Sequence, residues 1–241
     1  MTLIRYEGII DQIFRYCDRF VMFKEKRSRN MAFDYKKEFK QLYQPKKQPT
    51  IITIPKMKFL GIYGQGDPND VNGDYQKAIQ ELYMLSYTLK MSYKTDYEIL
   101  GFFEYVVPPL EGFWWQTGIQ GYDQTRKDLF QWLSVIRVPD FVTEKDFEWA
   151  KKQALTKKKL SSITAKLLTI DEGEVVQMLH VGPYDEEVHS LKVMEAFLEE
   201  AGYENDFSAS RHHHEIYLSD PRRCAPEKLK TILRHPVRPK G

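Results

Sequence analysis

The fold is organised around one short stretch near the end of the chain. Residues 211–221 read Arg-His-His-His-Glu-Ile-Tyr-Leu-Ser-Asp-Pro, a pattern that predicts a short strand ending at the proline. Side chains alternate across a strand, so His213, Glu215 and Tyr217 share one face and the residues between them share the other. A carboxylate on a buried face is costly unless it has a partner or a function. The alternative is an edge strand whose Glu215 lies in water.

The composition indicates a globular chain without a strong charge. Its 241 residues are 42% hydrophobic and 14% aromatic, enough to build the core of one large domain or two small ones. The net charge of +2 argues against direct binding of nucleic acid. No apolar run is long enough to span a membrane, and charged residues interrupt the start of the chain, so we expect neither a membrane segment nor a signal peptide. Two cysteines suit a reducing, cytoplasmic location.

A repeated order of elements divides the chain into two halves. In the first half, a strand runs into a Gly/Pro turn at residues 66–68 and an amphipathic helix follows over about 73–93. In the second, a strand over 174–184 ends in Gly-Pro and a helix follows over 186–201. We therefore expect an α+β fold made of duplicated strand-helix-strand-strand halves, with antiparallel sheets around a ligand groove.

The boundaries follow from the same patterns. Residues 1–30 are expected to form an N-terminal extension outside the fold, because the composition of the sequence changes after them. Residues 31–241 are expected to form a single ligand-binding domain of two repeats, at about 50–155 and 170–235.

Three segments complete the expected secondary structure. Residues 98–107 are predicted to be a strand, which the repeat aligns with the strand around Glu215. Residues 226–233 are predicted to form a closing helix, and the basic, proline-containing residues 235–241 are predicted to fray.

Two motifs resemble the GyrI-like small-molecule-binding domain family, which is related to the effector-binding domains of multidrug-sensing regulators. They are Gly182-Pro183-Tyr184 before a helix and the strand over 215–218. Residues 108–115, Pro-Pro-Leu-Glu-Gly-Phe-Trp-Trp, look like the stand-alone branch of that family. Some members of that branch are hydrolases that open the cyclopropane of DNA-alkylating natural products. The resemblance covers about residues 31–240, and it includes no counterpart of the regulators' DNA-binding helix-turn-helix.

The resemblance implies a set of site residues. Glu215 corresponds to the acidic residue of the ligand pocket and is the candidate catalytic carboxylate. Trp114 and Trp115 correspond to the aromatic walls, with Tyr184 and Tyr217 as further pocket residues. His213 is also a substrate-binding candidate, since it shares the face of Glu215. The expected partner is a flat, hydrophobic small molecule.

A carboxylate in an aromatic groove suits two kinds of function. Glu215 can take a proton from water that attacks an electrophilic carbon, or it can neutralise a cationic ligand that also contacts tryptophan rings. The first function is that of a hydrolase, and the second is that of a protein that sequesters hydrophobic or cationic compounds. A topoisomerase-protecting interaction protein is a third reading, suggested by the family.

Neither a metal ion nor a cofactor is expected. Alternation separates the three consecutive histidines, and no Cys or His lies at zinc-site spacing nearby. Residues 185–187 are predicted to be acidic side chains at the start of a helix, where the helix dipole favours them. Glu111 is a candidate second pocket acid, but its predicted turn position favours exposure to solvent.

Overall fold

A computed structural model describes residues 32–70, 73–119, 126–158 and 162–241. The fold is α+β, as expected. Its helices are α2 (Tyr35–Glu38), α3 (Lys40–Tyr43), α4 (Asp74–Lys90), α5 (Glu144–Lys158) and α6 (Glu187–Ala201). Its strands are β1 (Thr50–Ile54), β2 (Met57–Gln65), β3 (Leu110–Gln116), β4 (Phe130–Arg137), β5 (Lys166–Ile170), β6 (Gly173–Val181), β7 (Tyr203–Asn205), β8 (His213–Tyr217) and β9 (Lys230–Pro239). None of the helices in these ranges is long and apolar enough to cross a membrane.

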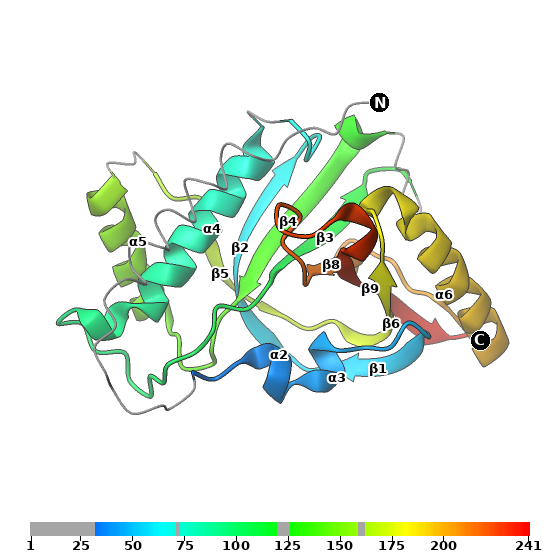
Figure 1. Ribbon diagram of the computed structural model, residues 1–241, viewed down its shortest axis with the longest axis horizontal. Helices are drawn as coiled ribbons and strands as arrows, with labels where there is room; N and C mark the ends of the chain where they lie inside the picture. Colours follow the sequence, from blue (N-terminus) through cyan, green and yellow to red (C-terminus); the bar gives the residue numbers. More distant parts are fainter. Residues whose placement is uncertain (1–31, 71–72, 120–125, 159–161) are drawn as a thin grey trace.

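Eight of the strands form one continuous antiparallel sheet in the order β1-β6-β9-β8-β3-β4-β2-β5, and β7 pairs with β9. The two halves of this sheet repeat each other. In the first half β2 pairs with β4 and β4 pairs with β3, and in the second β6 pairs with β9 and β9 pairs with β8. The halves meet where β3 pairs with β8 (Figure 1). The expected duplication is therefore confirmed, with the two predicted sheets joined into one.

An exchange of leading strands ties the halves together. β1 precedes β2 in the chain but pairs with β6 of the other half, and β5 precedes β6 but pairs with β2. Each half therefore needs a strand from the other to complete its sheet. The limits of the two repeats, about 50–155 and 170–235, stay a prediction.

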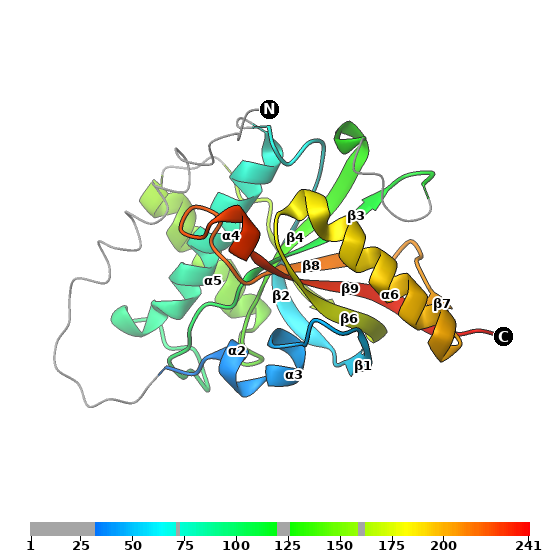
Figure 2. The ribbon, with the colours of Figure 1, turned by 45° about the vertical axis from the view of Figure 1, so that its right-hand side comes forward.

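Helices cover both faces of the sheet (Figure 2). On one face α4 packs on β2 and β4, and α6 packs on β6. Trp114, Trp132 and Leu233 point to this face and join its buried apolar clusters. On the other face, residues from α2 and α3 pack with Phe113, Ile216 and their neighbours. We call these the α4/α6 face and the α2/α3 face.

Two segments differ from the predicted secondary structure. Residues 98–107 form turns and irregular structure, with a single bridge between Phe33 and Tyr105, so the predicted strand is wrong. Its aromatic side chains pack around Phe141 rather than entering the sheet. The predicted C-terminal helix is also wrong, because only Pro226–Lys228 is helical and β9 then runs on to Pro239. Most of the residues predicted to fray are instead held by pairing with β6 and β7.

The helix of the second half agrees closely with its prediction. α6 ends at Ala201, and Gly202 follows with a φ of 72°, the left-handed conformation that favours glycine after a helix. The predicted N-terminal extension, residues 1–30, lies outside the described residues.

Candidate active site

Glu215 lies at the centre of the sheet, where the two halves meet. Its strand β8 has β9 on one side and β3 on the other, so the edge-strand alternative is excluded. Only 6% of Glu215 is exposed. Register places Gly112 of β3 directly opposite Glu215. A Cβ atom at Gly112 would lie 2.7 Å from Trp114 Nε1 and 3.2 Å from the Tyr217 hydroxyl, so glycine leaves room for these two groups.

Both oxygens of Glu215 are hydrogen-bonded by neighbours on its own face of β8. The Tyr217 hydroxyl donates to Oε2 over 2.7 Å, and His213 Nε2 lies 2.9 Å from Oε1. Trp114 Nε1 donates to the Tyr217 oxygen over 3.1 Å. Burial, together with the negative charge of Glu215, raises the pKa of Tyr217 well above its usual value. Tyr217 therefore keeps its proton at neutral pH and orients the carboxylate.

A second histidine extends this network into β9. His213 Nδ1 and His235 Nε2 lie 2.8 Å apart and share a hydrogen bond. Burial and the nearby His213 hold the pKa of His235 well below its usual value, so His235 is a neutral imidazole at physiological pH. The arrangement fixes the plane of the His213 ring and leaves its Nε2 directed at Glu215.

Glu187 adds a second carboxyl group that the sequence patterns above did not single out. It is the first residue of α6, it is 1% exposed, and its Oε1 has no hydrogen-bond partner among the described residues. Burial, and then the charge of Glu215, raises the pKa of Glu187 well above its usual value. One ligand-type atom from each of Glu187, His213 and Glu215 lies within 4.8 Å of the others. We call Glu187, His213, Glu215, Tyr217 and His235 the α4/α6-face cluster.

Helical spacing is the signal that would have found Glu187. It precedes Leu191, Met194 and Leu198 by four, seven and eleven residues, so it is in phase with the apolar stripe of α6. Residues 185–187 were predicted to share one role as an acidic helix start. In the structure Asp185 and Glu186 are exposed, and only Glu187 turns inward.

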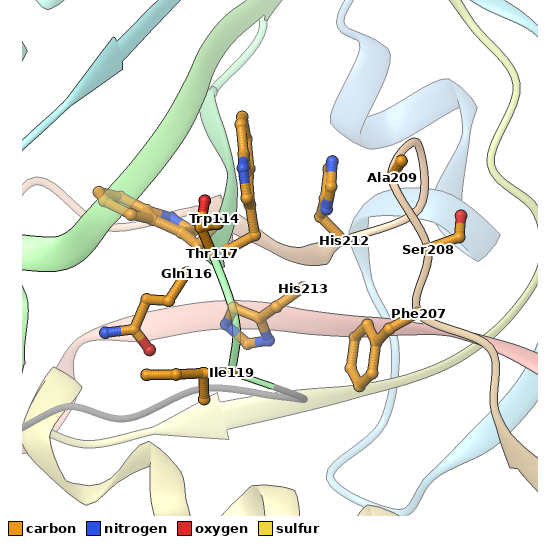
Figure 3. A pocket seen from close by; sticks show the side chains of 10 residues that line it. Trp114, Gln116, Thr117, Ile119, Phe207, Ser208, Ala209, His212 and His213 are labelled. Atoms are coloured by element: carbon orange, nitrogen blue, oxygen red, sulfur yellow. The ribbon is translucent and has the colours of Figure 1, made fainter.

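A cavity of about 400 Å³ opens at His213 of this cluster. Figure 3 shows the side chains that line it. It is lined by residues from the end of β3, the segment after it and the loop before β8: Trp114, Trp115, Gln116, Thr117, Ile119, Phe207, Ser208, Ala209, His212 and His213. His213 belongs to both the cavity wall and the cluster, so it connects the aromatic cavity to Glu215, which lies behind it.

The two tryptophans occupy different faces of the sheet. Trp114 points to the face of Glu215, where it is 5% exposed and packs on Tyr75 and Phe130. Trp115 points the other way and stacks on His212 with ring centres 4.2 Å apart. Trp114 and Trp115, which the resemblance implies as aromatic walls of the pocket of Glu215, therefore do not share its face: only Trp114 does, because adjacent strand residues alternate in direction. Trp115 reaches the cavity only at the end of β3, and its part in substrate binding stays a prediction.

Tyr184 lies at the turn between β6 and α6. Its ring meets the Tyr217 ring edge to face, with centres 5.9 Å apart. Tyr184 is absent from the wall of the cavity described above. It contacts the site through Tyr217, and its contact with substrate stays a prediction.

A second buried cluster lies on the α2/α3 face, directly behind the first. His214 Nε2 lies 3.1 Å from Glu111 Oε2, and His214 Nδ1 lies 2.8 Å from Glu172 Oε2. Arg234 Nη1 donates to Glu172 Oε1 over 3.3 Å, and the Tyr43 hydroxyl donates to Glu111 Oε1 over 3.3 Å. We call Tyr43, Glu111, Glu172, His214 and Arg234 the α2/α3-face cluster.

This second cluster corrects the expectation for Glu111. Its side chain is fully buried and hydrogen-bonded, not exposed at a turn, because Glu111 lies inside β3. Burial alone would lower the pKa of His214, but Glu172 and Glu111 outweigh it and raise that pKa. Glu111 therefore pairs with His214 on the face away from Glu215 and favours the protonated form of its ring.

Comparison with known proteins agrees with this architecture. The GyrI-like small molecule binding domain matches residues 47–238, so the chain belongs to this family. Among solved structures, an uncharacterised conserved protein from Listeria innocua is 50% identical, with a TM-score of 0.81, and covers 86% of this chain and 100% of its own. No curated protein matches the chain significantly.

Two further solved structures from Listeria innocua are described as hydrolases. They are 48% and 49% identical to this chain, with TM-scores of 0.78 and 0.79. Each match covers 86% of this chain and 100% of the other. A match over 86% of the chain is too long to be confined to one half of the sheet.

Proposed function

We propose that this protein is a hydrolase that adds water to the strained cyclopropane of flat, DNA-alkylating natural products, with Glu215 as the base that activates the water. The observation that carries the proposal is a buried, oriented carboxylate connected through His213 to an aromatic cavity. Two structures at 48% and 49% identity that are described as hydrolases support the reaction class. Detoxification in the cytoplasm is the corresponding biological role.

The geometry leaves Glu215 able to accept a proton. Each carboxylate oxygen has two lone pairs, and Tyr217 and His213 each occupy one of them. In the proposed step Glu215 takes a proton from water while the water oxygen bonds to the cyclopropane carbon. The C–C bond to that carbon breaks, and its electron pair moves through the dienone to the carbonyl oxygen. The resulting phenolate then takes the proton held by Glu215, so one water molecule is added overall.

A hydrogen-bond donor at the carbonyl oxygen would stabilise the phenolate as it forms. His212 is suited to this role because it lines the cavity and stacks on Trp115. Burial lowers the pKa of His212, and a hydrogen bond involving the Ala209 backbone offsets this only in part. His212 is thus a neutral imidazole at neutral pH and carries one N–H group. Aromatic walls suit a flat substrate because stacking selects for shape.

The test is to incubate the protein with a duocarmycin-like spirocyclopropyl dienone in ¹⁸O-labelled water and to follow the products by mass spectrometry. The expected product is the ring-opened adduct that carries one ¹⁸O atom. Glu215→Gln should remove most of the formation of this adduct. Glu195→Gln, which changes an exposed carboxylate on α6, should leave it unchanged.

A wild-type protein that forms no adduct would overturn the proposal. Tight binding without turnover would then support sequestration. In that case Glu215→Gln should weaken the binding of cationic ligands and leave the binding of neutral ones unchanged, because the carboxylate would act only as a counter-charge.

A further inference from the structure

The three groups Glu187, His213 and Glu215 come from two elements and meet at one point. His213 and Glu215 lie two residues apart on one face of β8, and Glu187 reaches them from the first turn of α6. Their exposed fractions are 1% for Glu187, 2% for His213 and 6% for Glu215. Two carboxyl groups and an imidazole enclosed together present oxygen and nitrogen ligands with little competing water. We propose that Glu187, His213 and Glu215 together bind a divalent transition-metal cation of the Zn²⁺ type.

The unpartnered oxygen of Glu187 is the independent observation that points to a ligand. A buried oxygen without a hydrogen bond is rare and costly, and Glu187 Oε1 is such an atom within the described part of the chain. It belongs to the same carboxyl group that faces the His213–Glu215 pair. A cation would supply the missing partner, and its two positive charges would balance the carboxylates of Glu215 and Glu187 once Glu187 has released its proton.

The groups around these three ligands match the outer shell of a metal site. Ligating histidines are usually held through their second nitrogen, and ligating carboxylates are themselves hydrogen-bonded. Here His235 holds His213 Nδ1, which leaves Nε2 for the cation, and Tyr217 holds Glu215 Oε2, which leaves Oε1. The hydrogen bond between His213 Nε2 and Glu215 Oε1 is the one that the cation would replace.

The dimensions suit this cation after small side-chain movements. The three ligand atoms lie within 4.8 Å of one another, whereas bonds of about 2.0–2.1 Å to a tetrahedral cation place ligand atoms roughly 3.4 Å apart. His213 Nε2 and Glu215 Oε1, which are 2.9 Å apart, would separate slightly, and Glu187 would move towards them. Three protein ligands leave a fourth position for water, as in catalytic zinc sites. His213 also lines the cavity, which gives the cation a way in.

This metal site shares His213 and Glu215 with the proposed hydrolase site, and it departs from the expectation of no metal. That expectation rested on residues close in sequence to the histidines. Glu187 precedes His213 by 26 positions in the printed sequence, so ligand spacing alone does not connect the two residues.

The test uses untagged full-length protein, stripped with a chelator and titrated with Co²⁺ as a spectroscopic stand-in for Zn²⁺. We expect saturable binding of one Co²⁺ per chain, visible d–d absorption of a low-coordinate site, and displacement by Zn²⁺. Glu187→Gln and His213→Ala should each weaken binding by at least about tenfold, the lower end of what even outer-shell changes cost. Glu186→Gln and His189→Ala, which change exposed neighbours on the same segment, should bind as wild type does.

Absence of saturable Co²⁺ binding would overturn the metal proposal, and so would binding that survives Glu187→Gln in a variant with wild-type melting behaviour. Turnover of the spirocyclopropyl substrate is measured separately on the stripped and on the metal-loaded protein. If the wild type turns substrate over but binds no metal, the metal site is rejected and the hydrolase proposal stands. If the wild type binds metal but turns over no substrate in either form, the hydrolase proposal is rejected and the metal site stands.

Discussion

Strand β8 carries two buried His–Glu clusters on its opposite faces, and they differ in how completely their polar groups are paired. In the α2/α3-face cluster, none of the buried side-chain atoms lacks a hydrogen-bond partner among the described residues. Glu111 and Glu172 there pair with His214, and Glu172 also pairs with Arg234. In the α4/α6-face cluster, Glu187 Oε1 and His235 Nδ1 have no partner within the described ranges, and His213 borders a cavity.

We propose that this difference separates a structural network from a functional one. A buried ionic network whose groups are all paired can hold the strands in register, but it has no free capacity for a ligand. A cluster with unpaired polar atoms beside a cavity has that capacity, and burial together with the charge of Glu215 raises the pKa of its Glu187 well above the usual value. The same residue types at adjacent positions of one strand therefore serve different purposes. The following predictions test that division.

The largest expected effect is on turnover. Glu215→Gln keeps the size of the side chain but removes the base, so turnover should fall by about 10²–10⁴-fold, with little change in melting temperature. Glu111→Gln makes the same chemical change on the α2/α3 face. It should leave turnover per folded molecule unchanged and lower the stability. Equal losses of turnover in the two variants would mean that both faces serve catalysis, contrary to the comparison.

The next effect is on stability. Glu172→Gln leaves Arg234 and His214 with one carboxylate fewer in a buried place, and breaking such a pair from one side costs about 3–5 kcal/mol. Glu187→Gln on the α4/α6 face replaces a carboxyl group whose pKa is raised well above its usual value, which favours the neutral form, so the change should be neutral or stabilising. Urea unfolding of both variants measures the difference. A Glu187→Gln variant less stable than Glu172→Gln would reverse the assignment of the two clusters.

A third prediction concerns acid pH. Burial would raise the pKa of Glu172, but His214 and Arg234 outweigh it and hold that pKa below its ordinary value of 4.5. A lowered pKa in the folded state stabilises the protein above pH 4.5, and this contribution disappears as the pH falls through the folded-state pKa. The stability gap between wild type and Glu172→Gln, followed by urea unfolding from about pH 7 to about pH 3, should therefore narrow towards acid. A constant gap would contradict this account.

The smallest effect concerns Trp115, which reaches the cavity from the side away from Glu215. Trp115→Ala should weaken the binding of neutral and of cationic flat ligands alike, because about 0.5–1.5 kcal/mol of stacking free energy is lost. Trp115→Phe should recover most of that affinity. Titration calorimetry with one ligand of each charge gives the comparison. Selective loss of cationic ligands would instead place Trp115 beside the carboxylates.

Much of the fold follows from local patterns. The α6 helix, its glycine end and the strand around Glu215 were all predictable, because hydrophobic period and turn residues are local properties. The prediction for 98–107 failed because its aromatic residues resemble a strand but pack against Phe141. The prediction for the C-terminal segment failed because the pairing partners of β9, which include β6 and β7, lie elsewhere in the chain.

The candidate site also has a part that local sequence patterns predict and a part that depends on distant contacts. The sequence by itself determined that His213, Glu215 and Tyr217 share one face of a strand while His214 faces the other, since alternation needs no partner. Only the tertiary structure decided that β8 is central, that Glu187 joins Glu215, and that Glu111 and Glu172 close on His214. Those contacts join residues 28 to 103 positions apart. Strand pairing and helix placement depend on the burial of the whole sheet, and a local hydrophobic pattern does not determine which distant segments pair.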